Sequence, residues 1–441
     1  MGKISSKISI ILAVSLLTLS PVLSAANDNN AESTTAKLIS QAKEGDKDSQ
    51  YLLARYYLSK ASPSTQGIDW LKKATEQNHP QALFELAYHY EVGNLVKKDL
   101  AKAIYLYKKA AELGNVDAQY NLGLAYAKGK SLKQDHKLAK KWFEKAASSG
   151  DADAQYNLAV IYEKGLGVPV NQKEATYWYQ QSAQNGNVNA QFSIATRYML
   201  GDVAPRNDAQ AAFWFEKAAQ QGDASAQFNL ALLYELGRGV KKDDEKALEL
   251  YQKAAEAGDT GAQYNLAIKY TLADGVEKNM HKAINWFRKA AENNNALAQL
   301  ALGYLYDQGE HVRKDTEQAV YWYRQAAENG NDNAQYNLAL MFSSGNGVER
   351  SDKEAFKWFE KSAMQDNPAA QYNLAVAYTA GKGIEQDLSK AYFWYLLSSS
   401  HDYDGAADNA EYISKLLTES EVNETQQKAS EFLAKLVNST K

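Results

Sequence analysis

The hydrophobic and polar positions of this chain follow one pattern that recurs along most of its length. The stretch "AQYNLAVIYEKGLGV" (154–168) returns as "AQFNLALLYELGRGV" (226–240) and "AQYNLALMFSSGNGV" (334–348). An earlier copy begins at Ser49, with a shorter loop after it. The alanine that opens the stretch recurs every 36 residues, at Ala82, Ala118, Ala154, Ala190, Ala226, Ala262, Ala298, Ala334 and Ala370. Self-similarity at this period predicts a solenoid of ten stacked repeats.

Each repeat predicts two helices. In the first, which we call helix A, Leu122, Ala125 and Tyr126 and their counterparts recur at helical spacing. The second, helix B, is seen in "AVYWYRQAAENG" (319–330). All eight tryptophans occupy one position of helix B: Trp70, Trp142, Trp178, Trp214, Trp286, Trp322, Trp358 and Trp394. Because leucine replaces tryptophan at Leu106 and Leu250, this position is expected to pack in the core.

The residues between the helices predict helix ends. Asp135 and Asn171 stand where helix B would begin, and both can accept a hydrogen bond from a free amide of the first turn. Gly186 follows helix B, where a left-handed residue commonly ends a helix. The pair Gly165 and Gly167 separates helix A from helix B, and other copies relax it, which favours a turn over a phosphate-binding loop.

Composition supports an all-α protein and narrows its function. The 441 residues are 45% apolar and contain six prolines, which is unlike disordered or all-β chains. A formal charge of −4 gives no indication of nucleic acid binding. The chain has no cysteine, so disulfides and a lipid anchor on cysteine are excluded.

The first residues resemble a secretory signal peptide. Lys3 and Lys7 precede a short apolar run at 8–19, and small residues lead to Ala26. We expect residues 1–26 to be removed by cleavage near Ala26 and the protein to be periplasmic or secreted. No later apolar run reaches the length of a membrane span, so no membrane insertion is expected.

No pattern indicates catalysis, a metal or a cofactor. The six histidines are never spaced as a metal-binding pair, and without cysteine a zinc site has no support. The segment 123–131 has glycines near a lysine and a serine, but their spacing differs from that of a phosphate-binding loop. We therefore expect a protein that is not an enzyme, with no catalytic residue, metal or cofactor.

The helix A pattern A-Q-Y-N-L-G/A-x-x-Y-x-x-G-x-G-V and the helix B pattern K-A-x-x-W-Y/F-x-K-A-A-x-x-G resemble the Sel1-like repeat, a relative of the tetratricopeptide repeat. The resemblance implies a right-handed superhelical α-solenoid in which helix A lines a concave surface. Members of the family are chiefly scaffolds and adaptors, and exported bacterial members are linked to host interaction or envelope assembly. One exported subset is rich in cysteine, and this chain departs from it.

The predicted organisation has four parts. The signal peptide covers 1–26, and a linker with a capping helix covers 27–48. Ten repeats span 49–405, starting near 49, 82, 118, 154, 190, 226, 262, 298, 334 and 370. Capping helices and a tail follow at 406–441, where Thr418 and Glu421 have the spacing of a capping box.

By analogy with tetratricopeptide grooves, two columns of helix A are candidates for binding. The aromatic column comprises Tyr120, Tyr156, Phe192, Phe228, Tyr264, Tyr336 and Tyr372. The asparagine column comprises Asn121, Asn157, Asn229, Asn265, Asn337 and Asn373. Amides can hold a peptide backbone and rings give rigid contact area. The alternative is that both columns only pack helices together.

Specificity is expected at positions that vary between repeats. Glu163 and Glu235 belong to a variable and rather acidic column, which mildly favours a basic or neutral partner, and Arg197 and Tyr304 break the consensus. The leading hypothesis is an exported scaffold that binds a protein or peptide through the concave surface lined by helix A, which we call the helix A face. The alternative is a carbohydrate- or peptidoglycan-binding envelope protein, because aromatic and amide rows also hold sugars. A hydrolase is the third hypothesis, since carboxylates are plentiful.

Overall fold

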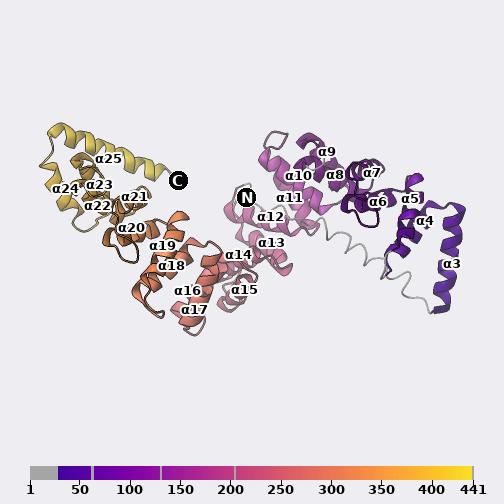
Figure 1. Ribbon diagram of the computed structural model, residues 1–441, viewed down its shortest axis with the longest axis horizontal. Coiled ribbons are helices and arrows are strands. Elements are labelled where there is room, and N and C mark those ends of the chain that lie inside the picture. The colour runs from indigo at the N-terminus through magenta and orange to yellow at the C-terminus, as the bar shows by residue number, and fades with distance from the viewer. Residues whose placement is uncertain (1–27, 61–63, 130–131, 203–204, 440–441) are drawn as a thin grey trace. The chain divides into compact units, whose positions relative to one another are not determined.

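The computed structural model describes residues 28–60, 64–129, 132–202 and 205–439, and within them it contains 23 helices and no strands (Figure 1). Ten helix A and helix B pairs follow one another along the chain, which confirms the predicted all-α solenoid of ten repeats. The predicted signal peptide, residues 1–26, lies outside the described residues.

Helix A of each repeat is 12 or 13 residues long. In chain order these helices are α4 (Lys47–Leu58), α6 (Pro80–Val92), α8 (Val116–Lys128), α10 (Ala152–Lys164), α12 (Val188–Leu200), α14 (Ala224–Leu236), α16 (Thr260–Leu272), α18 (Ala296–Gln308), α20 (Asp332–Ser344) and α22 (Pro368–Ala380). The corresponding helices B are α5 (Thr65–Glu76), α7 (Leu100–Glu112), α9 (His136–Ser148), α11 (Gln172–Gln184), α13 (Asp208–Gln220), α15 (Asp244–Glu256), α17 (Met280–Glu292), α19 (Thr316–Glu328), α21 (Asp352–Ala363) and α23 (Leu388–Ser399).

The helix ends have the local causes that the sequence predicts. Asp151 caps α10 and Asn171 caps α11, each by accepting a hydrogen bond from a backbone amide of the first turn. Gly165 ends α10 with a φ of 68°, and Gly167 in the same turn has a φ of 73°. Gly186 after α11 has a φ of 92°. These left-handed positions explain why glycine recurs at both junctions of a repeat.

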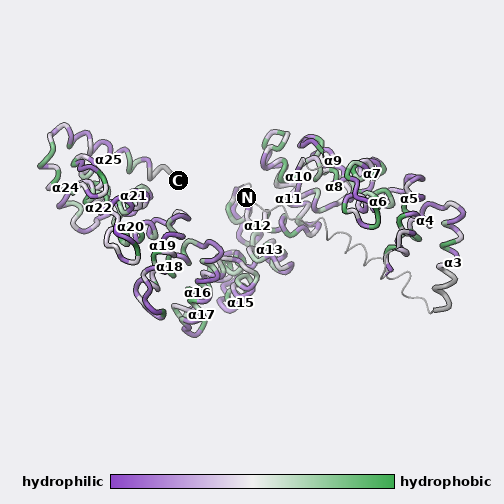
Figure 2. The backbone as a smooth tube through the Cα atoms, viewed as in Figure 1, coloured by the Kyte–Doolittle hydropathy of each residue, from purple (hydrophilic) through white to green (hydrophobic). Residues whose placement is uncertain are grey.

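Alanine, leucine and aromatic side chains fill the core between helices. Trp142, Trp322, Trp358 and Trp394 are buried, and the other four tryptophans are half-buried. The tryptophan position is therefore a packing position, as its replacement by leucine predicts. Figure 2 shows hydrophobic and hydrophilic residues interleaved along the helices. Within the described residues, no helix combines the length and the apolar character that crossing a membrane requires.

Extra helices lie at both ends of the repeats. At the amino-terminal end, α3 (Asp28–Glu44) precedes α4, and Gln50 donates to the Ala42 carbonyl at 3.2 Å. At the other end are α24 (Ala406–Ser414) and the long α25 (Glu419–Ser439). Thr418 and Glu421 exchange hydrogen bonds at the start of α25, as in a capping box.

The chain divides into two compact units between Lys217 and Ala218. Up to this boundary, α4 to α12 form the first four helix pairs and the helix A of the fifth. The pairs from α14 and α15 onward, together with α24 and α25, belong to the second unit.

Candidate functional site

The aromatic column of helix A packs on helix B of the same repeat. Every member is half-buried. Each ring lies 5.5–5.9 Å, between centroids, from an aromatic ring 23 residues later. The pairs are Tyr120–Phe143, Tyr156–Tyr179, Phe192–Phe215, Phe228–Tyr251, Tyr264–Phe287, Tyr336–Phe359 and Tyr372–Tyr395. These rings hold the two helices of a repeat together, so only part of each is available to a ligand.

The asparagine column is also half-buried and engages nearby polar groups. Asn157, Asn229 and Asn373 each donate a side-chain hydrogen bond to the carbonyl four residues earlier, at 2.7–2.8 Å. Burial raises the pKa of Tyr120, and a hydrogen bond with Asn157 of the next repeat acts in the opposite direction. The asparagine amides thus form hydrogen bonds within their own helix and with the neighbouring repeat. Contact with a partner stays a prediction for all six asparagines, including Asn121, Asn265 and Asn337.

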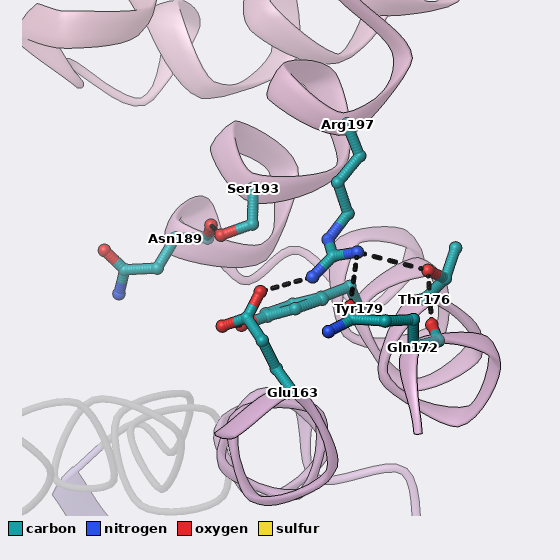
Figure 3. A network of polar contacts seen from close by, with 7 residues as sticks. All are labelled: Glu163, Gln172, Thr176, Tyr179, Asn189, Ser193 and Arg197. Carbon is teal, nitrogen blue, oxygen red and sulfur yellow. Dashed lines mark hydrogen bonds and ion pairs between the residues drawn. The ribbon is translucent and has the colours of Figure 1, made fainter. Parts of the chain in front are cut away.

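Glu163 and Arg197 belong to one polar network between neighbouring repeats (Figure 3). The Arg197 guanidinium forms an ion pair with Glu163 and donates to Gln172 at 3.3 Å. The hydroxyl of Tyr179 donates to the other Glu163 oxygen at 3.1 Å, and the guanidinium lies 5.1 Å from the Tyr179 ring centroid. The network therefore joins α10, α11 and α12.

The same arrangement recurs around Glu235 with lysine in place of arginine. The Tyr251 hydroxyl donates to Glu235 at 2.7 Å, and the ammonium of Lys269 pairs with the second carboxylate oxygen. Lys269 is buried and also binds Asp274 at 2.7 Å. Because internal cations neutralise Glu163 and Glu235, these carboxylates do not by themselves favour a basic partner.

One part of the helix A face is apolar and exposed. Leu297 is 48% exposed and Tyr304 is 50% exposed, and both lie on α18 seven residues apart, on the same side of the helix. Leu340, 36% exposed, occupies the position of Tyr304 in the next repeat. Ala301 stands where neighbouring repeats carry asparagine. We call Leu297, Tyr304 and Leu340 the apolar patch.

The sequence pattern singled out Tyr304 but not the other two members of the apolar patch. Leu297 has a signal, since it stands where Asp153 and Asn333 stand in other repeats. Leu340 has none, because leucine and valine are common at its position and are elsewhere half-buried. Exposure of Leu340 depends on the side chains around it, which only the structure shows.

One acidic group has an unusual titration. Desolvation, with the charges of Asp153 and Asp117 nearby, raises the pKa of Asp151 to about 6. Asp151 is the N-cap of α10 and accepts from the Ala154 amide at 2.6 Å, which accounts for its position without a catalytic role. Among the described residues, no group of three or more His, Asp or Glu side chains could hold a metal ion.

Comparison with known proteins places the repeats in a family. The family model described as the Sel1 repeat matches ten consecutive segments: 47–79, 80–115, 116–151, 152–187, 188–223, 224–259, 260–295, 296–331, 332–367 and 368–403. The matched repeats start two residues before the predicted ones. A comparison with curated protein sequences gave no significant match.

Two solved structures resemble this chain over most of its length. One is a protective antigen present in uropathogenic Escherichia coli strains that displays an SLR fold. It is 31% identical, with a TM-score of 0.62, over 90% of this chain and 94% of the other. The second is a Sel1 repeat protein from Oxalobacter formigenes, 32% identical with a TM-score of 0.54, over 76% and 88%. Sel1 repeat solenoids generally serve as non-catalytic scaffolds for protein–protein interaction. With ten matched repeats and these relatives, the chain belongs to the Sel1 repeat family.

Proposed function

We propose that this protein is an exported scaffold that binds a protein partner through the helix A face, with the apolar patch at the centre of the contact. The observation that carries the proposal is the exposure of Leu297, Tyr304 and Leu340 on α18 and α20. Binding energy in protein interfaces concentrates in a few large side chains, with tyrosine over-represented, that lose their water on contact. The remaining helix A residues would surround this centre as a polar rim.

A role outside the cytoplasm rests on two further points. The signal peptide pattern of residues 1–26 favours export to the periplasm or beyond. The protein of uropathogenic Escherichia coli that resembles this chain is a protective antigen, which supports host interaction over assembly of an envelope complex.

The test is an affinity capture with the full mature chain, from envelope extract and separately from host secretions. The variant Leu297→Ser/Tyr304→Ser should retain less than about a tenth of the partner, because both anchors are removed. Tyr412→Ser is a matched control, since Tyr412 of α24 is 61% exposed, more than Tyr304, but lies outside the helix A face of the repeats. Equal capture by the unchanged chain, the double variant and the control variant would contradict binding through the helix A face. Retention on purified cell wall without a protein partner would favour the carbohydrate alternative.

A further inference from the structure

Helix B presents pairs of aromatic rings on a surface separate from the helix A face. Tyr177 and Trp178 lie 5.0 Å apart with their planes at 77°, and Tyr321 and Trp322 lie 4.9 Å apart at 77°. Tyr177 and Tyr321 are each 50% exposed. Two edge-to-face rings with one ring open to solvent form a shallow apolar platform that suits a third ring.

In the last repeat, a ring pair of this kind is covered by a third aromatic ring. Phe393 and Trp394 of α23 lie 5.1 Å apart at 83°, which matches the geometry of the two exposed pairs. Phe432 of α25 packs on both rings, with its centroid 5.8 Å from Phe393 and 6.1 Å from Trp394. Ala429, one turn before Phe432, is buried, so a small residue lets α25 approach closely.

Four other repeats cover the tryptophan with their own lysine, and in the similar pair Phe213–Trp214 the ammonium of Lys217 lies 5.7 Å from the Phe213 ring centroid. An ammonium lies 4.1–4.5 Å from the ring centroid in the pairs Lys73–Trp70, Lys145–Trp142, Lys289–Trp286 and Lys361–Trp358. In each pair the lysine stands three residues after the tryptophan. Three residues after Trp178 and Trp322 stand Gln181 and Gln325 instead. The Tyr177–Trp178 and Tyr321–Trp322 pairs therefore lack the lysine that covers the tryptophan elsewhere. Their exposed surface is mainly that of Tyr177 and Tyr321, because Trp178 is half-buried and Trp322 is buried.

We propose that Tyr177–Trp178 and Tyr321–Trp322 are docking points for an amphipathic helix of a partner protein. This helix carries an aromatic residue with a small residue one turn before it, and inserts the ring as α25 inserts Phe432. The surface is independent of the helix A face, so the scaffold could hold a helical partner there while the helix A face binds another protein. The packing of α25 on α23 is the basis for the orientation of this partner helix and for the side chains that it carries.

The test uses the full chain and a fluorescent synthetic peptide of residues 419–439, titrated by fluorescence anisotropy. Tyr177→Ser/Tyr321→Ser should weaken binding of the peptide by about tenfold or more, the loss that a few ring contacts represent. The same peptide with Phe432→Ala should bind the unchanged chain equally weakly. Tyr105→Ser is the matched control: Tyr105 is 62% exposed at the same helix B position, but Leu106 follows it in place of tryptophan. This variant should bind within about twofold of the unchanged chain.

Three results would overturn the proposal. The first is the absence of binding to the unchanged chain, and the second is equal binding to the double variant, which would place the peptide at its own seat on α23. The third is displacement of the peptide by solubilised cell-wall glycan, combined with unaltered binding of the Phe432→Ala peptide, which would assign the rings to a sugar ligand. Circular dichroism melting confirms that each variant is folded.

Discussion

At the residue scale, most side chains singled out by the repeat pattern have structural partners. Asp151 caps α10, yet its carboxylate is desolvated and lies near Asp117 and Asp153. Its pKa of about 6 in the folded chain exceeds the ordinary value of 3.8. A raised pKa means that folding favours the neutral acid, so the stability that this group contributes is present below about pH 4 and is lost as pH rises through 6.

Replacement of Asp151 by asparagine should remove the free-energy cost of keeping this desolvated carboxylate ionised above pH 6. Asn115 and Asn187 cap the neighbouring helices A and accept the same amide bond, at 2.7 and 2.8 Å, so asparagine fits the position. Above pH 7 we expect Asp151→Asn to stabilise the fold by about 1–2 kcal/mol, a figure reduced for the partial exposure of the group. The gain should shrink between pH 6 and 4 and vanish below. Thermal melting across this range is the measurement, and a gain independent of pH would contradict the assignment.

At the element scale, a glutamine in helix A links three helices. Gln155 donates to the Ala147 carbonyl of the preceding helix B at 3.1 Å and accepts at 2.9 Å from Asn185, the C-cap residue of the following helix B. Gln227 makes the first of these bonds, to Ala219 at 3.2 Å, but its side-chain oxygen is buried without a partner among the described residues. Ala257 stands where Asn185 stands in the earlier repeat, and alanine has no donor to offer.

Ala257→Asn should supply the missing donor to Gln227. Satisfying a buried acceptor is worth about 0.5–1.5 kcal/mol, so we expect the free energy of unfolding to rise by that amount. Ala257→Asp has the same shape but no donor at neutral pH and should give no gain. Chemical denaturation of both variants is decisive, and equal stability of the two would show that the bond does not form.

At the scale of the whole molecule, stability is built from contacts between neighbours in the sequence order of the repeats, as expected for a solenoid. Such a stack must cover the apolar faces at its ends. At the carboxyl end α25 does this by packing on α23 (Figure 1). Phe432 of α25 contacts Phe393 and Trp394 of α23. Thr425 and Ala429 are buried along the same side of α25.

Removal of residues 419–441 should expose this aromatic surface. Each large apolar side chain that loses its cover costs about 1.5–3 kcal/mol, so we expect the melting temperature to fall by about 5 °C or more. Binding of a hydrophobic dye and concentration-dependent association, measured by light scattering, should increase. Phe432→Ala in the full chain should shift each quantity in the same direction by less. Unchanged melting after the truncation would mean that α25 does not stabilise the end of the stack.

The sequence predicted the periodic features well because their causes are local. Caps such as Asn171 and left-handed glycines such as Gly165 act within a few residues, and each turn repeats the same solution. The pairing of Glu163 with Arg197 was not predicted. These residues are 34 positions apart, and their contact depends on how the last turns of two helices A face each other.

By itself, the sequence determined the helices, their ends, the ten repeats and the tryptophan core, since a residue type that recurs every 36 positions must satisfy the same surroundings each time. Tertiary structure decided which candidate residues are available to a partner. In the folded chain the aromatic column packs on helix B, and Arg197 and Lys269 neutralise Glu163 and Glu235. Leu297, Tyr304 and Leu340 stay exposed. The physical reason is that exposure and charge pairing depend on neighbouring helices, whose side chains differ from one repeat to the next.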